Sequence, residues 1–148
     1  MDKLKVDKIA ENLITIHPLL YKSISKPMRT QTSITPGGMF VMGSLTRHGT
    51  LSMSQIGKCL LMPNPHVTVI VDKLIDAGFV QRQNDPNDRR VINILLTEKG
   101  TANFESIKRS TVKNLNNKLS LLTDEDLEIL STASMQVREI LLKILAKK

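Results

Sequence analysis

Residues 85–90 read Asp-Pro-Asn-Asp-Arg-Arg and lie between two short apolar-rich runs, Phe79–Gln83 and Val91–Leu96. Polar turn residues between two such runs predict a β-hairpin with a long, charged tip. The residues before the hairpin, 65–77, predict an amphipathic helix that ends at Gly78. The apolar residues of this helix recur at the spacing of one helix face: Val67, Ile70, Val71, Leu74 and Ile75. The sequence therefore predicts a helix followed at once by an arginine-tipped hairpin.

Two shorter helices are predicted upstream. Thr35-Pro36 is a cap followed by proline at the first helical position, and it predicts a helix that runs to about His48. Ser52-Met-Ser-Gln55 is a capping-box pattern that opens a third helix, and Asn64 is a candidate N-cap for the fourth. In such an arrangement a helix can lie in the major groove of DNA and the hairpin can reach the adjacent minor groove. We expect a mainly α fold with a small β-hairpin wing, a winged helix-turn-helix DNA-binding domain over residues 35–100.

The flanking segments predict further helices. An apolar stripe near the N-terminus predicts a first helix, which Pro18 should kink or divide, and the polar residues 25–33 predict a connection after it. Two helices follow the hairpin, and the last has an apolar face between Leu127 and Leu145. Because a small central domain cannot bury all these faces, we expect residues 1–34 and 101–148 to pair with a second copy of the chain. The alternative is an antiparallel pair of helices within one chain.

The charge balance is compatible with a polyanionic partner. The chain has 148 residues and a formal net charge of +7, and its pI is about 9.7. Lysine-rich composition without such a partner is the alternative. Residues 51–100 carry six Lys or Arg against five Asp or Glu, so this block is nearly neutral. The argument therefore depends on where Lys73, Arg82, Arg89 and Arg90 point.

Several function classes are disfavoured. The sequence has no apolar run of membrane-spanning length and no secretory signal, and its one cysteine, Cys59, fits a reducing compartment. We expect a cytoplasmic protein with a buried, inert thiol. His17, His48 and His66 lie in separate segments without metal-ligand spacing, so no metal is expected. We find no glycine-rich phosphate loop and no nucleophile–histidine grouping, so we expect neither a cofactor nor an enzyme.

These motifs occur in an order that resembles the MarR (multiple-antibiotic-resistance regulator) family. The specific signal is the Asp-Pro-x-Asp-x-Arg wing followed by Leu96-Thr-x-x-Gly100. The resemblance implies a homodimeric transcription factor, usually a repressor that a small anion, a phenolic compound, a metal or an oxidant releases from DNA. We therefore expect a homodimer that binds a pseudo-palindromic operator in double-stranded DNA. The alternative is a winged-helix protein-interaction module that does not bind DNA.

The wing offers three candidate DNA contacts. Arg90 is the foremost of them, because a guanidinium at a hairpin tip can enter the narrow minor groove. Asp88 lies two residues away and can hold Arg90 by a charge-assisted hydrogen bond, a pairing that the resemblance also implies. The side chain of Arg89 should point to the opposite face of the hairpin from Arg90, where it is better placed to bind a DNA phosphate. The alternative is a solvated wing whose surface ion pair contributes about 0–1 kcal/mol.

The fourth helix and its start offer five candidates: Asn64, His66, Thr68, Val69 and Lys73. His66 and Thr68 have hydrogen-bonding groups for base edges. Val69 favours apolar contact with thymine methyl groups, and Lys73 suits phosphate. For Asn64 the alternative role is capping.

The third helix and two acidic residues complete the predicted surface. Ser52, Ser54 and Gln55 can bond backbone phosphates, although capping alone explains Ser52 and Gln55. Asp72 and Asp76 on the fourth helix would repel phosphate unless they turn aside or pair with Lys73.

An effector pocket is implied by the resemblance, between the dimer helices and the winged domain. His17, Tyr21 and Arg29 could meet an anionic or phenolic ligand, and Met39 and Met42 could line an adaptable wall. For each of these residues taken singly, an ordinary core or surface role is the preferred alternative. The identity of the effector, the operator and the direction of regulation do not follow from the sequence.

Overall fold

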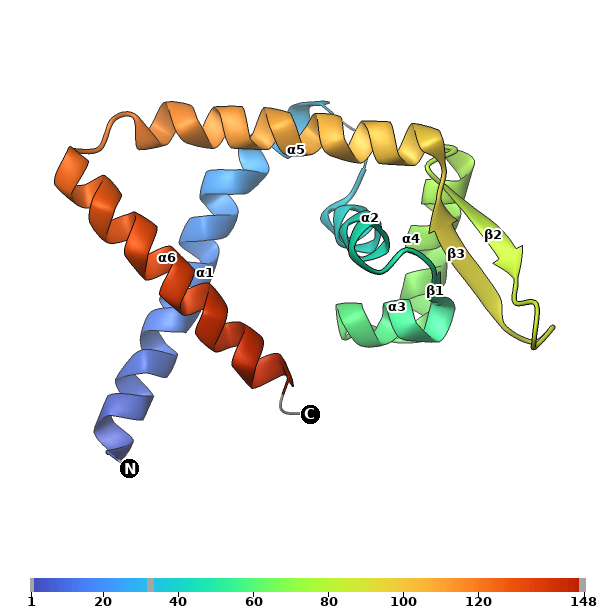
Figure 1. Cartoon of the computed structure of the whole chain (residues 1–148), viewed down its shortest axis with the longest axis horizontal. Helices are drawn as coiled ribbons and strands as arrows, with labels where there is room; N and C mark the ends of the chain where they lie inside the picture. The colour runs from blue at the N-terminus through green and yellow to red at the C-terminus, as the bar shows by residue number, and fades with distance from the viewer. Residues whose placement is uncertain (1, 32–33, 147–148) are drawn as a thin grey trace. The chain divides into compact units, whose positions relative to one another are not determined.

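The computed structural model describes residues 2–31 and 34–146, with side chains at 2–23 and 34–144. These residues form helices α1 (Lys3–Gln31), α2 (Pro36–His48), α3 (Met53–Leu60), α4 (Asn64–Asp76), α5 (Glu98–Leu119) and α6 (Asp124–Ala146), and strands β1 (Leu51–Ser52), β2 (Val80–Asn84) and β3 (Ile92–Leu96). The mainly helical fold with a small antiparallel sheet confirms the predicted fold class (Figure 1). The chain divides into two compact units, residues 1–111 and 112–148, and each is described by itself.

The sheet has the strand order β1-β3-β2, and both pairs are antiparallel. Val80 pairs with Leu96 and Asn84 with Ile92, which confirms the predicted hairpin. The sequence pattern did not predict β1, in which Leu51 pairs with Ile94. A strand of two residues is too short for an alternating pattern to be visible. Its pairing places β3 in the middle of the sheet.

The core of the first unit lies where α2, α3 and α4 meet the sheet (Figure 1). Helix α4 contributes Val67, Val71 and Leu74, which are buried, and Ile70 and Ile75, which are partly buried, so the predicted inward face is confirmed. The other buried members of the core are Val41, Met42, Leu45, Leu51, Ile56, Val80 and Ile94. Close packing of this cluster joins α4 and the base of the hairpin into one body.

Helix α2 begins and ends where the sequence predicts. The Gly38 amide donates a hydrogen bond to Thr35 Oγ1 at 3.2 Å, and Pro36 is the first helical residue. The helix ends at His48 because Gly49 adopts a left-handed φ of 76°. Both boundaries follow from local chemistry.

Pro18 does not divide the first helix, and the predictions of a connection from residue 25 and of a cap at Asn64 are wrong. Helix α1 continues through Pro18 to Gln31, so residues 25–31 are helical rather than a connection; residues 32 and 33 lie outside the described residues. A proline removes one helical hydrogen bond but does not end a helix whose flanking turns form. Asn64 is the first residue of α4 and not its cap, and Pro63 occupies the cap position without a side-chain cap bond.

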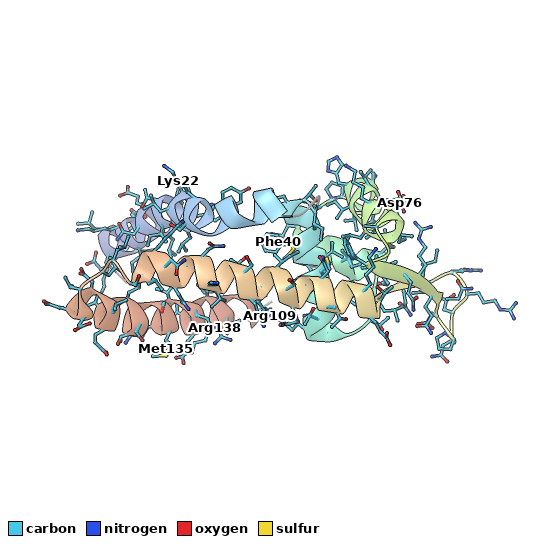
Figure 2. The ribbon with its side chains drawn as sticks, turned by 90° about the horizontal axis from the view of Figure 1, so that it is seen from above. Lys22, Phe40, Asp76, Arg109, Met135 and Arg138 are labelled. Carbon is cyan, nitrogen blue, oxygen red and sulfur yellow. The ribbon has the colours of Figure 1, made fainter. Side chains whose placement is uncertain are left out.

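The second unit contains α6 and the end of α5. The Asp126 amide donates a hydrogen bond to Thr123 Oγ1 at 3.2 Å, and the Thr123 hydroxyl donates one to the Asp126 carboxylate at 3.0 Å. Helix α6 exposes large apolar side chains, among them Met135, which projects from the helix (Figure 2). Across residues 2–31 and 34–146, no helix combines the length and apolarity that a membrane crossing requires.

Candidate nucleic-acid interface

The wing tip, residues 85–91 between β2 and β3, is folded by the carboxylate of Asp85. The backbone amides of Asn87 and Asp88 donate hydrogen bonds to Asp85 Oδ1 at 2.9 and 3.1 Å. The Asn93 side chain donates one to Asp85 Oδ2 at 2.9 Å. These bonds favour the charged carboxylate and lower the pKa of Asp85, with the Asn87 amide as the largest cause, followed by the Asn93 side chain and the Asp88 amide. Asp85 is absent from the sequence-predicted site, although aspartate before such a turn often accepts backbone amides.

Asp88 makes a second contact of this kind. The backbone amide of Arg90 donates a hydrogen bond to Asp88 Oδ1 at 2.9 Å, so the bond between these residues uses the backbone and not the guanidinium. The side chains of Arg89 and Arg90 are exposed, and within the described residues neither forms an ion pair. Side chains that end in nitrogen extend beyond the ribbon at the hairpin end (Figure 2). Asp85 and Asp88 thus hold the backbone of the wing tip through hydrogen bonds to its amides, and this backbone carries the side chains of Arg89 and Arg90.

The base of the hairpin is seated on the first turn of α5. The Thr97 hydroxyl donates a hydrogen bond to the Gly78 carbonyl at 2.7 Å, and the Gly100 amide donates one to Thr97 Oγ1 at 2.9 Å. A Cβ at Gly100 would lie 1.9 Å from the carbonyl oxygen of Phe79, so only glycine fits there. Lys99 Nζ lies 5.2 Å from the centre of the Phe79 ring. The Leu-Thr-x-x-Gly motif therefore joins the hairpin to α5.

The outer surface of α4 holds most of the predicted recognition residues. His66, Val69 and Lys73 are exposed, and 56% of Val69 is accessible. Thr68 is exposed too, but its hydroxyl donates to the Asn64 carbonyl at 3.0 Å, so its donor is engaged within the helix. The exposed surface of α4 therefore combines the polar side chains of His66 and Lys73 with the apolar side chain of Val69.

The start of α3 is a complete capping box. The Gln55 amide donates to Ser52 Oγ at 3.3 Å, and the Ser52 amide donates to Gln55 Oε1 at 2.7 Å. Both side chains are engaged in capping, whereas Ser54 is exposed. Gly57 of the same helix is buried, and a Cβ there would lie 3.0 Å from Asn64 Oδ1. Close approach at this glycine fixes α4 against α3.

Asp72 pairs with an arginine of the hairpin and not with Lys73. Arg82 Nη2 on β2 donates to Asp72 Oδ1 at 2.6 Å, which links the recognition helix to the hairpin. The residues beside them, Ile75, Asp76, Val80 and Gln81, line a shallow hollow with the pair. Asp76 is exposed and has no ion-pair partner among the described residues.

The candidate effector residues differ in how far their side chains are buried. Met42 is fully buried in the core and Met39 is half-buried, whereas His17 and Tyr21 are exposed. The side chain of Arg29 lies outside the described residues. Neither the hollow beside Asp72 nor a second one on α6 includes any of these residues.

The prediction that Cys59 is buried is wrong, because its side chain is exposed. The inward face of α3 is made by Ile56 and Gly57, with Met53 and Leu60 partly buried. Cys59 lies outside that face. In a helix of eight residues, one misplaced position is enough to reverse the expected burial.

Comparisons with known proteins agree with this geometry. A family profile described as the MarR family matches residues 34–92. The chain is 31% identical, over 76% of its length and 69% of the relative, to the HTH-type transcriptional repressor MdtR of Bacillus subtilis (strain 168). Among solved structures, the YusO protein from Bacillus subtilis is 26% identical with a TM-score of 0.67, over 100% of this chain and 99% of that one. NadR, solved in complex with 4-hydroxyphenylacetate, is 24% identical with a TM-score of 0.65 over 87% and 91%, a likeness of fold.

The family profile covers the helices and most of the hairpin that form the candidate interface. MdtR extends the similarity to three quarters of the chain. The chain therefore belongs to the MarR family of winged helix-turn-helix transcriptional regulators, which are DNA-binding proteins and not enzymes.

Proposed function

We propose that this chain is a homodimeric repressor that binds a pseudo-palindromic operator and leaves it when a small ligand binds. The observation that carries the proposal is the wing tip. Asp85 and Asp88 fold its backbone and leave Arg89 and Arg90 exposed. A basic hairpin tip with a fixed backbone can insert into the minor groove while the adjacent exposed helix lies in the major groove of the same duplex.

In this proposal the wing and the recognition helix have separate roles. Arg90 enters the minor groove and responds to its width, while Arg89 binds phosphate. His66 and Val69 face base edges in the major groove, where Val69 suits the methyl group of thymine. Lys73 binds phosphate.

The remaining polar candidates lie at helix starts. Thr68 offers its methyl group, since its hydroxyl donor is engaged with the Asn64 carbonyl. Ser54 binds phosphate through its exposed hydroxyl, and Ser52 and Gln55 orient α3 so that its backbone amides approach the same strand.

The outer helices, α1 and α6, support dimerisation. Helix α1 exposes Leu4 and Ile14, and α6 exposes Ile129 and Ile140. Apolar helix faces of this kind mark interfaces when a single chain leaves them uncovered. We assign residues 1–34 and 101–148 to the dimer and residues 35–100 to DNA binding. Two-fold symmetry then places the two copies of α4 about one helical turn, ~10 base pairs, apart on one side of the duplex.

Repression is supported by a relative of this chain. MdtR is named a transcriptional repressor. A phenolic anion such as 4-hydroxyphenylacetate, the ligand in the NadR structure, is a suitable probe for the candidate effector residues: His17, Tyr21, Arg29, Met39 and Met42. Of the two methionines, Met39 is the more accessible to a ligand.

The test of the proposal is an operator-binding titration of Arg90→Ala, after selection of a bound fragment from genomic DNA. We expect the affinity to fall at least about fivefold, because one arginine contact contributes about 1–3 kcal/mol. Arg109→Ala is the matched control, since it removes an exposed arginine from α5 instead of the wing (Figure 2). Equal affinity of both variants and the wild type contradicts the role of the wing. DNA binding that does not weaken with salt favours the protein-interaction alternative.

A further inference from the structure

Helix α4 carries two carboxylates on the surface that the proposed function turns toward DNA. Asp72 Oδ1 lies 2.6 Å from Arg82 Nη2, and the two side chains are 50% and 49% accessible. Asp76 is exposed on the outside of α4 (Figure 2) and forms no ion pair within the described part of the chain. One acidic residue of the recognition helix is therefore matched by an arginine of the hairpin, and the other is not.

The ion pair is not needed to hold the hairpin against α4. Val80, the first residue of β2, is buried in the core. The Phe79 amide donates to the Leu74 carbonyl at 2.9 Å, and Thr97 fixes the same junction from α5. A half-exposed ion pair adds little to folding stability. The effect of the pair lies in the charge that this surface presents to a ligand.

We infer that Asp72 limits sequence-independent DNA binding by engaging Arg82 and withholding it from phosphates. This inference rests on the proposed DNA-binding function. A free arginine at the edge of the interface binds phosphate whatever the base sequence and releases counterions as it does so. Held by Asp72, the guanidinium of Arg82 makes no such contact.

The Asp72–Arg82 ion pair lowers the affinity for random DNA more than the affinity for the operator. In the operator complex, base contacts fix the register, so a freed Arg82 meets phosphate only if the geometry allows it. On random DNA the protein can shift along the duplex until the arginine finds a phosphate. Asp72 therefore raises the ratio of operator affinity to random-DNA affinity, and it makes Arg82 and Asp72 a specificity-determining pair.

The test is the salt dependence of binding to a random-sequence duplex, measured by fluorescence anisotropy between 50 and 200 mM salt. Each added phosphate contact steepens the slope of log K against log salt by about 0.9, and the homodimer frees one Arg82 in each subunit. The slope should therefore steepen by about 1.8, which is roughly a 12-fold greater loss of affinity over this range. We expect Asp72→Asn to show that steepening and to bind random DNA more tightly at low salt. Asp72→Ala should behave in the same way.

Two further variants isolate the mechanism. Asp76→Asn removes the same charge from the same helix without releasing an arginine, so its slope should stay within half of the expected change. The double variant Asp72→Asn, Arg82→Gln should return to the wild-type slope, because the added contact needs Arg82. Thermal melting monitored by circular dichroism checks that all variants fold alike.

An unchanged slope in Asp72→Asn, or the same steepening in Asp76→Asn or in the double variant, overturns the inference. Failure of the proposed function is a different result: the wild type would not select any genomic fragment, and Arg90→Ala would bind DNA as the wild type does. A wild type that binds its operator while Asp72→Asn leaves the slope unchanged removes only the inference about Asp72.

Discussion

The wing tip and the outer helices differ in how they complete their interactions. At the wing tip, Asp85 and Asp88 satisfy backbone amides within a few residues, and the polar loop is folded by its own side chains. On α1 and α6, large apolar side chains such as Ile14 and Ile140 remain exposed in the single chain. The wing tip is complete in a single chain, whereas the apolar faces of α1 and α6 are the surfaces that the proposed dimer would cover. In the proposed function, DNA contact therefore depends on hydrogen bonds and charge, whereas assembly depends on burial of apolar surface. Substitutions in the two regions should affect DNA binding and dimerisation independently.

The largest effect should come from a charge on the apolar face of α6. Ile140→Glu would place a carboxylate in each half of the proposed dimer interface, where an unpaired buried charge costs several kcal/mol. We expect the dimer dissociation constant to rise by at least about two orders of magnitude, and operator binding to be lost with it. Sedimentation velocity measures the first effect and anisotropy the second.

Thr132→Glu is the control for this substitution, because Thr132 is also exposed on α6 and lies one helical turn from Glu128 and Gln136, on the polar side of the helix. It should remain dimeric. An Ile140→Glu protein that stays dimeric at micromolar concentration would remove α6 from the interface and weaken the contrast between the two regions.

A second, smaller effect should come from Gly100→Ala, which attacks the seat of the wing. The new Cβ would lie 1.9 Å from the Phe79 carbonyl oxygen, so the hairpin base or α5 must move. Overpacking of this kind costs about 1–3 kcal/mol, more than the roughly 1 kcal/mol that alanine gains over glycine in a helix. We expect a lower melting temperature and weaker operator binding.

Gly43→Ala is the matched comparison for this effect. Its Cβ would meet Phe104 Cζ at 3.4 Å, which is close to ordinary contact, and helix propensity should keep or raise the melting temperature. If both alanine variants melt alike, the close approach at Gly100 does not control the stability of the hairpin base.

The smallest effect concerns acid and the wing tip alone. Hydrogen bonds lower the pKa of Asp85 below its ordinary value of 3.8. Because the folded pKa is depressed, the stabilisation is present above pH 3.8 and is lost as the pH falls through the lower, folded value. The Asn87 and Asp88 amide resonances should shift in that acid range and stay constant near neutral pH.

Asp85→Asn should abolish this acid step and weaken operator binding by several-fold, with the dimer intact. Asp124→Asn, at the exposed start of α6, should leave the wing resonances unchanged. An acid transition that persists in Asp85→Asn would show that another carboxylate folds the tip.

Features that depend on local chemistry could be predicted from the sequence. The caps at Thr35 and Ser52 and the glycine stop at Gly49 each involve residues within four positions of one another, so their patterns are visible in the chain. The polar turn between two apolar-rich runs likewise predicted the hairpin, and the helical spacing of apolar residues predicted the inward face of α4.

Features that depend on distant partners could not be predicted. The Asp72–Arg82 bond joins residues ten positions apart in different elements, and no spacing rule selects Arg82 over Lys73 as the partner. The exposure of Cys59 depends on how the short α3 is rotated in the core. Continuation of α1 through Pro18 depends on the balance of many weak helical preferences against a single lost bond.

The contact between Gly100 and Phe79 also has a mechanical meaning. Since there is no room for even a Cβ between the start of α5 and the Phe79 carbonyl, we expect the start of α5 and the base of the hairpin to move together. The five-residue strand β2 extends about 16 Å from that pivot. A rotation of α5 by a few degrees would therefore sweep the arginines sideways by an ångström or more, enough to change how they fit a narrow groove.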